Sequence, residues 1–167
     1  MPAVPFETMP DDARVWVFAS DRELDSSREK ALLETVDEFL GGWHAHGAPL
    51  HCARTWRDHR FLAIAVDQRT EGASGCSIDG LFRVFKALEP QLGASLTAGG
   101  RIFYRDDRGT IRSVSRDEFG RLAESGSVDA TTPVFDASIT TAEAWRSRFE
   151  LPAGRSWHAT LLGAAHR

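Results

Sequence analysis

The chain has 167 residues, 42% of them hydrophobic and 26% charged, and its net charge is -4. This length and balance are typical of one folded domain with a hydrophobic core. The small negative charge supplies no overall basic field for a nucleic acid. We therefore expect a single domain over residues 1–167 that binds no nucleic acid, with residues 1–13 as a loose N-terminal arm.

Two features favour a cytoplasmic protein. Cys52 and Cys76 are too few for a disulfide framework, which favours a reducing compartment. The N-terminal segment is acidic and Pro-rich rather than basic and then apolar, and no apolar run approaches membrane-spanning length. We therefore expect neither a signal peptide nor binding to a membrane.

Three β-rich runs predict strands over residues 14–19, 51–57 and 61–66. The third run, Phe61–Val66, is almost continuously apolar, which is typical of a central strand buried on both faces. The polar, glycine-containing residues 67–76 that follow it predict a loop.

Two amphipathic helices complete the first part of the chain. The first is predicted to start near Ser27, because Ser26 and Glu29 have the spacing of a capping box. The second follows the loop and is predicted to bend or end at Pro90, since proline removes a helix hydrogen bond. Its apolar face consists of Ile78, Leu81, Phe82, Phe85, Leu88 and Leu92.

The later residues predict shorter elements. Strands over 101–105 and 110–114 flank Asp106–Gly109, a strong hairpin signal. Ser115 and Glu118 again have capping-box spacing and predict a short helix over 116–124. A further strand over 132–135 and a helix from Thr140 through Phe149 follow.

The order β-α-β-β-α-β through residue 105 is that of the ferredoxin-like, split βαβ motif. We predict an α+β fold with about five strands in a mixed or mainly antiparallel sheet, helices mainly on one face, and an extra C-terminal strand and helices. In this topology the end of the first helix and the start of the second lie at one end of the sheet. The hairpin at Asp106–Arg108 is expected at that end too.

Cys76 is the first candidate for chemistry, in the turn Ser74–Asp79 that precedes the second helix. Unpaired backbone N–H groups and the helix dipole favour a thiolate there, and the same groups bind an anion or a developing oxyanion. Ser74 or Ser77 suits the N-cap and Asp79 the first turn, with Gly75 allowing the turn itself. The alternative is a small buried cysteine with a packing role only.

His44 and His46 are the second candidates. In an extended segment both imidazoles point to one side, so either one is a candidate general base for Cys76. The alternative is a helix C-terminus, where histidine favours the helix dipole and bonds the last carbonyls.

The sequence indicates no resident cofactor. Ligand type alone would allow zinc, since the side chains of His44, His46, His51, Cys52 and Cys76 are of the kinds that bind it, but their spacing matches no known finger or ribbon. We therefore expect no metal site. The chain also lacks a GxxxxGK[ST] loop, a GxSxG elbow, a GxGxxG turn and a CxxC pair, which argues against a P-loop ATPase and thioredoxin-type exchange.

Basic residues crowd the predicted turn between the second and third strands. Arg54, Arg57, His59 and Arg60 surround Trp56, a combination that binds phosphate or single strands in some proteins. We interpret them instead as an exposed sheet edge covered by arginine side chains.

The chain resembles a bacterial family of small uncharacterised proteins of similar length. The resemblance lies in Trp43–Gly47, in the apolar strand, and in the segment ASGCSID at Ala73–Asp79. The resemblance extends to Val134–Asp136 and to Ser156–Trp157. Members of that family often carry the automatic label "ABC transporter ATPase", which conflicts with the missing Walker A loop. The family has no established activity, so the resemblance implies no function.

Two hypotheses remain open. In the first, the protein is an enzyme of acyl transfer or hydrolysis, with Cys76 as nucleophile, His44 or His46 as base, and the helix N–H groups as oxyanion donors. In the second, it is a non-enzymatic module whose turn at Ser74, Gly75, Ser77 and Asp79 binds a small anionic ligand or a protein partner.

Overall fold

A computed structural model describes residues 4–45, 48–49, 51–69, 75–97 and 99–163. The chain folds into two compact units. The first consists of Met1–Thr97 with Ser138–Arg146, and the second of Ala98–Ala137 with Ser147–Arg167. The expectation of one domain stays a prediction, and each unit is described by itself.

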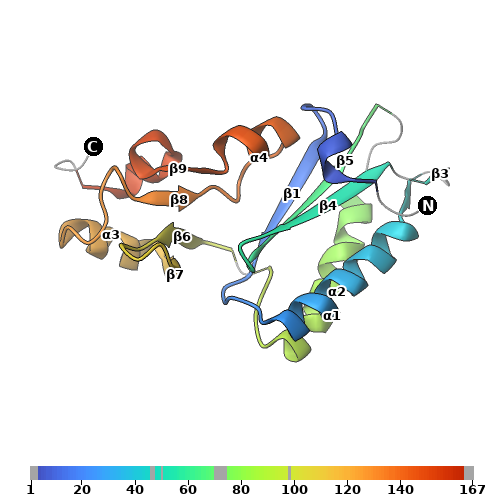
Figure 1. Cartoon of the computed structure of the whole chain (residues 1–167), viewed down its shortest axis with the longest axis horizontal. Helices are drawn as coiled ribbons and strands as arrows, with labels where there is room; N and C mark the ends of the chain where they lie inside the picture. Colours follow the sequence, from blue (N-terminus) through green and yellow to red (C-terminus); the bar gives the residue numbers. More distant parts are fainter. Residues whose placement is uncertain (1–3, 46–47, 50, 70–74, 98, 164–167) are drawn as a thin grey trace. The chain divides into compact units, whose positions relative to one another are not determined.

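The fold is α+β, as predicted. The described residues form antiparallel sheets of three and four strands, a two-stranded pair and four α-helices (Figure 1). These elements are compatible with a ferredoxin-like type of fold. The prediction placed about five strands in one sheet, whereas the structure divides the strands between separate sheets.

The first unit is built on a three-stranded sheet in the order β1-β5-β4. Its strands are β1 (Arg14–Ala19), β4 (Cys52–Arg57) and β5 (Phe61–Val66). β5 pairs antiparallel with both neighbours along its full length, and all six of its side chains are buried. The predicted central strand is therefore confirmed.

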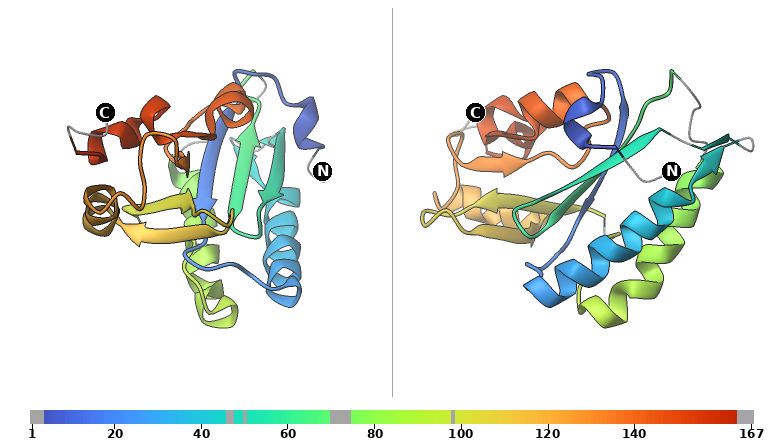
Figure 2. Two further views of the ribbon diagram at one scale, coloured as in Figure 1. Left: turned by 60° about the vertical axis from the view of Figure 1, so that its left-hand side comes forward. Right: turned by 45° about the vertical axis from the view of Figure 1, so that its right-hand side comes forward.

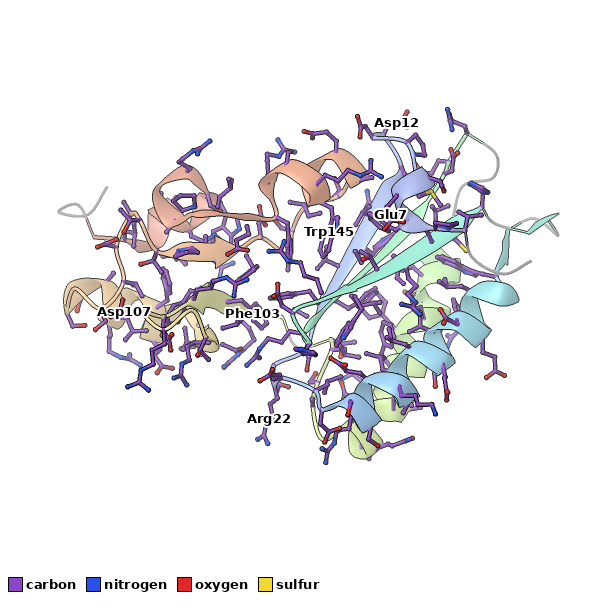
Figure 3. The ribbon with its side chains drawn as sticks, viewed as in Figure 1. Glu7, Asp12, Arg22, Phe103, Asp107 and Trp145 are labelled. Carbon is purple, nitrogen blue, oxygen red and sulfur yellow. The ribbon has the colours of Figure 1, made fainter. Side chains whose placement is uncertain are left out.

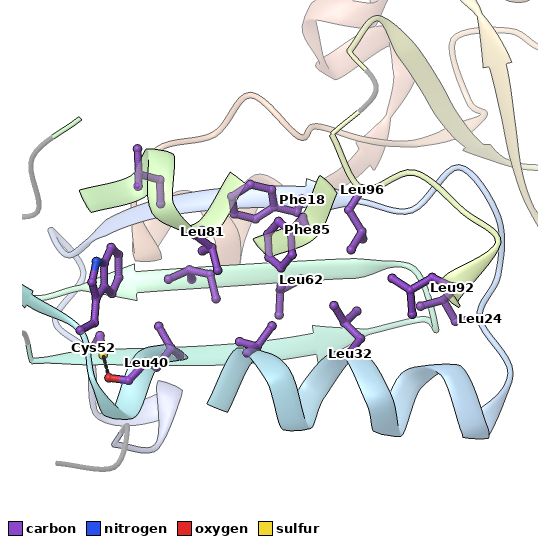
Figure 4. Close-up of a cluster of buried hydrophobic side chains, with 14 of the residues drawn as sticks. Phe18, Leu24, Leu32, Leu40, Cys52, Leu62, Leu81, Phe85, Leu92 and Leu96 are labelled. Atoms are coloured by element: carbon purple, nitrogen blue, oxygen red, sulfur yellow. Dashed lines mark hydrogen bonds between the residues drawn. The ribbon is translucent and has the colours of Figure 1, made fainter. Parts of the chain in front are cut away.

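Two helices cover one face of this sheet, α1 (Ser26–Gly41) and α2 (Gly75–Leu92), and lie side by side in both views of Figure 2. Leu62, Ile64 and Val66 of β5 share a core with both helices, because alternate strand residues point to the same face. Figure 4 shows this core, with Phe18, Leu62 and Phe85 near its middle.

The ends of the two helices differ slightly from the prediction. Asp25, rather than Ser26, is the N-cap of α1, and its carboxylate accepts a hydrogen bond from the backbone N–H of Arg28 at 2.9 Å. A carboxylate next to the positive end of the helix dipole is a strong cap. α2 continues two residues beyond Pro90 and ends before Gly93, whose φ of 63° suits a left-handed stop.

The N-terminal residues, expected to be a loose arm, make fixed contacts from residue 4 onward. A short 3₁₀ turn, η1 (Phe6–Thr8), places Phe6 in a buried position, and Met9 is buried too. The guanidinium of Arg146 donates hydrogen bonds to the carbonyls of both residues and pairs with Asp11. The burial of Phe6 and Met9 and the hydrogen bonds of Arg146 therefore hold residues 6–11 in place.

The edge of β1 that faces away from β5 is partly occupied. Val15 N–H donates to the carbonyl of Thr140 at 2.9 Å, and Arg14 forms an isolated bridge with Thr141. A ferredoxin-like motif has its fourth strand along this edge. The strand expected there, β6 (Arg101–Arg105), pairs instead in the sheet of the second unit.

The second unit has a four-stranded antiparallel sheet in the order β7-β6-β8-β9. It comprises β6, β7 (Ile111–Ser115), β8 (Pro133–Phe135) and β9 (Glu150–Pro152). The β6–β7 hairpin, the strand at β8 and the helix α3 (Arg116–Glu124) with its Ser115 cap confirm the predictions for these residues. A buried cluster around Ile102 and Phe119 is its core.

The remaining elements are short. They are β2 (His44–Ala45), β3 (Ala48–Pro49), α4 (Ala142–Arg148), η2 (Ala153–Arg155) and η3 (Trp157–Leu161). Thr141, not the predicted Thr140, caps α4, because its hydroxyl accepts from Ala144 N–H at 3.1 Å. None of the helices found in the described ranges is both long enough and apolar enough to cross a bilayer.

Two phenylalanines of α2 offer a matched test of this core. Both contact the ring of Phe18, but Phe85 is fully buried whereas Phe82 is 39% exposed. We expect Phe85→Ala to lower the free energy of unfolding by about 3–5 kcal/mol, because it leaves a cavity. Phe82→Ala should cost about 1 kcal/mol, mainly through the lost ring contact. Urea unfolding measures both values, and equal losses would show that the α2 face is wrongly placed.

Candidate functional site

The backbone around the predicted turn has the expected order of elements. β5 ends at Val66, α2 begins at Gly75, and Cys76 is its second residue. Residues 46 and 70–74, together with the side chains of His44, Cys76 and Ser77, lie outside the described part of the structure. The contact between Cys76 and a histidine therefore stays a prediction, as does the role of Ser74 and Gly75.

Asp79 is the predicted site residue whose side chain the structure describes. It is exposed and is the fifth residue of α2, and no acidic residue occupies the first turn of that helix. The expectation that Asp79 lies in the first turn is therefore wrong. The helix begins at Gly75, so the carboxylate is one turn farther from the free N–H groups.

The elements that carry these residues meet at one end of the first unit. Cys52 at the start of β4 pairs with Val66 at the end of β5, and its thiol lies 3.8 Å from the carbonyl of Leu40 near the end of α1 (Figure 4). Gly80 near the start of α2 lies against the ring of Phe39. The end of α1 and the start of α2 therefore share one end of the sheet, as predicted.

The structure removes the basis for the prediction that the hairpin at Asp106–Asp107–Arg108 lies at the same end of the sheet. The expectation required β6 to be the fourth strand of the same sheet, and β6 pairs with β7 and β8 instead. Asp106 is engaged within its own hairpin, where its carboxylate accepts from the N–H groups of Arg108 and Thr110 and from Arg112. These bonds to Asp106 explain the turn without a functional role.

Asp67 fixes the start of the loop that leads to Cys76. Its carboxylate is almost fully covered and accepts hydrogen bonds from the backbone and the guanidinium of Arg69. These bonds lower the pKa of Asp67 below its usual value. Its backbone N–H donates to the carbonyl of His51, so the loop leaves the sheet beside the exposed His51.

Cys52 is excluded as a second reactive thiol. Its side chain is buried in the core, and burial raises the pKa of the thiol to about 11. A neutral thiol in hydrocarbon is neither a nucleophile nor a ready zinc ligand. Within the described ranges, no three His, Cys, Asp or Glu residues are placed to bind one metal ion.

The basic residues of the β4–β5 hairpin are paired with acidic or polar groups. Arg54 forms two hydrogen bonds with Asp37, and Arg57 pairs with Asp58. Arg60 donates to the carbonyl of Ser20 at 3.3 Å. These partners agree with the interpretation of an arginine-covered sheet edge rather than a nucleic-acid site.

The tip of the same hairpin holds a polar cluster that the sequence did not reveal. Glu29 in the first turn of α1 accepts hydrogen bonds from Trp56 Nε1 at 2.9 Å and from His59 Nδ1. Glu29 is 17% exposed and His59 is 60% exposed, so the carboxylate is covered while the imidazole reaches solvent. Neighbouring carboxylates, above all that of Glu29, raise the pKa of His59.

The backbone of this turn is strained. Asp58 and His59 have φ values of 57° and 58°, as a type I′ turn requires, although neither is glycine. Such a conformation costs of order 1–3 kcal/mol per residue and is common at functional sites. The cluster also borders a hollow of about 410 Å³ lined by Glu23, Leu24, Asp25, Ser26, Glu29 and His59.

Another polar cluster lies near the C-terminal end of the second unit, at Ser156–His158. The Ser156 hydroxyl lies 2.8 Å from Nδ1 of the buried His158, whose ring stacks on Trp157 with centroids 4.0 Å apart. Trp157 Nε1 donates to Asp136 at 3.1 Å. Burial lowers the pKa of His158 to about 4, so the ring is neutral and serves packing.

Searches against protein-family models, curated proteins and solved structures found no match to this chain. The resemblance to the bacterial family therefore stays a prediction.

The contact between His59 and Glu29 makes a pH-dependent contribution to stability. Because the pKa of His59 is raised in the folded state, the contribution is fully present below the unfolded value of about 6.5 and is lost as pH rises through the folded value. We expect His59→Asn to lower unfolding free energy more at about pH 5.5 than at about pH 9. Asparagine tolerates the same positive φ, so backbone strain hardly changes.

Chemical denaturation at the two pH values measures this difference. Arg57→Ala is the control in the same hairpin, since an arginine does not titrate in this range. A loss for His59→Asn that is equal at both pH values would contradict the pairing with Glu29.

Proposed function

We propose that the protein has its functional site at the turn before α2, with Cys76 as the nucleophile of an acyl transfer or hydrolysis. The supporting observation is the position of Cys76 as the second residue of an 18-residue helix that follows the buried central strand. The first N–H groups of a helix have no partner within it. They would stabilise a thiolate and, later, the oxyanion of the tetrahedral intermediate.

In this proposal a histidine from the end of α1 supplies the base. His44 starts β2, two residues after the C-cap Gly42 of α1, and the end of α1 lies at the same end of the sheet as the start of α2. His44 or His46 takes the thiol proton and returns it to the leaving group. The sulfur forms a bond to the acyl carbon while the leaving group departs, and water or another acceptor then releases the acyl group.

The thiol chemistry implies a reducing environment, so the proposal includes a cytoplasmic location. The substrate is an activated acyl compound.

One observation favours a second candidate function, binding of an anion without catalysis. α1, α3 and α4 each carry an acidic residue in the first turn, whereas α2 carries none. An unneutralised N-terminus suits a phosphate or carboxylate, on a small ligand or on a protein partner. Ser74, Gly75 and Ser77 would then contact the anion.

The rate of Cys76 alkylation as a function of pH separates the two functions. The enzyme requires an apparent thiol pKa near or below neutrality, whereas a passive cysteine alkylates with a pKa near 8.5. Iodoacetamide consumption by the intact protein measures it. Cys52 adds little background because its thiol is buried with a pKa of about 11, and Cys52→Ser removes the remainder.

Two variants sharpen this test. The alkylation of His44→Ala and of His46→Ala should each be compared with that of the parent protein. The variant that lacks the base should show a higher apparent pKa of the Cys76 thiol. A thiol pKa of about 8.5 in the parent protein, unchanged in both variants, would overturn the enzyme and leave the anion-binding module.

A further inference from the structure

Two side chains of the first unit have buried N–H groups without a partner. Nε of Arg14 and Nε1 of Trp43 are both covered, and neither atom has a hydrogen-bond partner among the described residues. Trp43 is only 5% exposed, whereas Arg14 is partly open to solvent. A covered donor without an acceptor costs free energy, and folded proteins leave few of them. Both donors therefore call for an acceptor that binds from outside.

Arg14 lies at the end of the sheet where α2 begins. Figure 3 labels Asp12 and Arg22, which lie just before and just after β1 and mark its two ends. α2 ends at the Arg22 end of β1, because Leu92 lies next to Leu24 there (Figure 4). The first turn of α2 is therefore at the other end of β1, where Arg14 is the first strand residue.

The side chain of Arg14 belongs to the face of the sheet that the helices cover. Alternate residues of a strand share a face, so Arg14 lies on the same side as Trp16 and Phe18. The ring of Phe18 contacts Phe82 and Phe85 of α2. Arg14 therefore points toward the side of the sheet on which α2 starts.

The guanidinium of Arg14 is held in place but is not neutralised. Its Cζ lies 5.1 Å from the centre of the Trp16 ring, a stacking contact that leaves the in-plane N–H groups free. No carboxylate pairs with it in the part of the chain that the structure describes. Asp67, which follows the β5 partner of Arg14, is bound to Arg69 instead. An oxyanion is the acceptor that a free guanidinium fork prefers.

Trp43 lies between the end of α1, β1 and the start of α2. Its ring contacts those of Trp16 and Phe39, with centroids 6.5 Å and 5.5 Å apart. The ring of Phe39 in turn lies against Gly80 of α2. Trp16 therefore contacts both side chains whose donors lack a partner, Arg14 and Trp43.

The start of α2 adds further donors. Its first N–H groups have no partner within the helix, and no acidic residue occupies its first turn. A guanidinium fork, an indole N–H and helix N–H groups together offer more donors than a carboxylate has oxygens. A tetrahedral phosphate suits such a set better, since it has more oxygens and a larger charge.

We propose that the ligand of this site carries a phosphate group, bound by the Arg14 guanidinium, by Nε1 of Trp43 and by the first N–H groups of α2. This inference rests on the proposed function only in placing the site at the start of α2, and it adds the class of the ligand, a phosphorylated small molecule. The partly open Arg14 is the group that the phosphate meets first.

A titration of the full-length protein with inorganic phosphate, followed by amide and indole NMR signals, tests the proposal. Sodium chloride at the same ionic strength is the reference. We expect saturable shifts of the Trp43 indole N–H signal and of the amides of residues 75–78. The indole signal of Trp56 should stay unchanged, because its N–H already donates to Glu29 at the other end of the sheet. Acetate should bind at least about tenfold more weakly, since it has fewer oxygens and a smaller charge.

Two variants assign the donors. Trp43→Phe keeps an aromatic ring without the N–H, and Arg14→Gln removes the charge. Each should weaken phosphate binding at least about fivefold, because a hydrogen bond to a charged group is lost. Trp56→Phe and Arg83→Gln are the matched controls and should bind phosphate as the parent protein does, since Trp56 lies at the other end of the sheet and Arg83 is exposed on α2.

The proposal would be overturned by the absence of saturable shifts at about 20 mM phosphate, by shifts confined to other residues, or by unchanged affinity in either variant. Its failure is distinct from that of the thiol enzyme. Phosphate binding together with a Cys76 pKa near 8.5 would remove the enzyme and retain this site. A Cys76 pKa near neutrality without phosphate binding would retain the enzyme and remove this site.

Discussion

The burial of β5 on both faces, together with its pairing on both edges, is the constraint on which the first unit depends. Leu62, Ile64 and Val66 pack under α1 and α2, while Phe61, Ala63 and Ala65 are buried on the other face. Full antiparallel registers with β1 and β4 fix the strand in one position, since a slip of one residue would exchange its faces. This strand therefore determines which connections reach each end of the sheet.

The two ends of β5 lead to connections of different character. At the Val66 end lie the start of β4, the end of α1 and the loop toward Cys76, anchored by Asp67 and Arg69. At the Phe61 end lie the strained turn of Asp58 and His59 and the start of α1. The turn that precedes α2 and the strained turn of Asp58 and His59 thus lie at opposite ends of one strand.

Much of the fold could be predicted from the sequence because its signals are local. Strands β1 and β5, the Asp106–Gly109 hairpin and the Ser115 cap of α3 each depend on residues within a few positions of one another. The sheet that receives β6 could not be predicted, because it depends on a long-range pairing with β8 about thirty residues later. The predicted N-cap of α1 was wrong by one residue, because Asp25 and Ser26 are both residue types that cap helices well.

Less of the candidate sites could be predicted. The position of Cys76 at the start of a helix followed from the glycine and serine residues before it. The pairing of His59 with Glu29 joins residues thirty positions apart, and nothing in either local sequence indicates it. The hydrogen bond from Trp157 Nε1 to Asp136 likewise joins residues 21 positions apart. The positive φ values at Asp58 and His59 also escaped prediction, because such turns usually contain glycine.

The most direct test of the central claim is paramagnetic broadening from a nitroxide attached to Cys76 in the Cys52→Ser variant, in which Cys76 is the one thiol of the sequence. β5 spans six residues, or about 17–20 Å, so its ends differ clearly in distance from a label at the start of α2. The account predicts strong broadening of the amides of His51, Cys52 and Asp67, with those of Asp58 to Phe61 little affected. Equal broadening at both ends, or stronger broadening at Asp58 to Phe61, would contradict it.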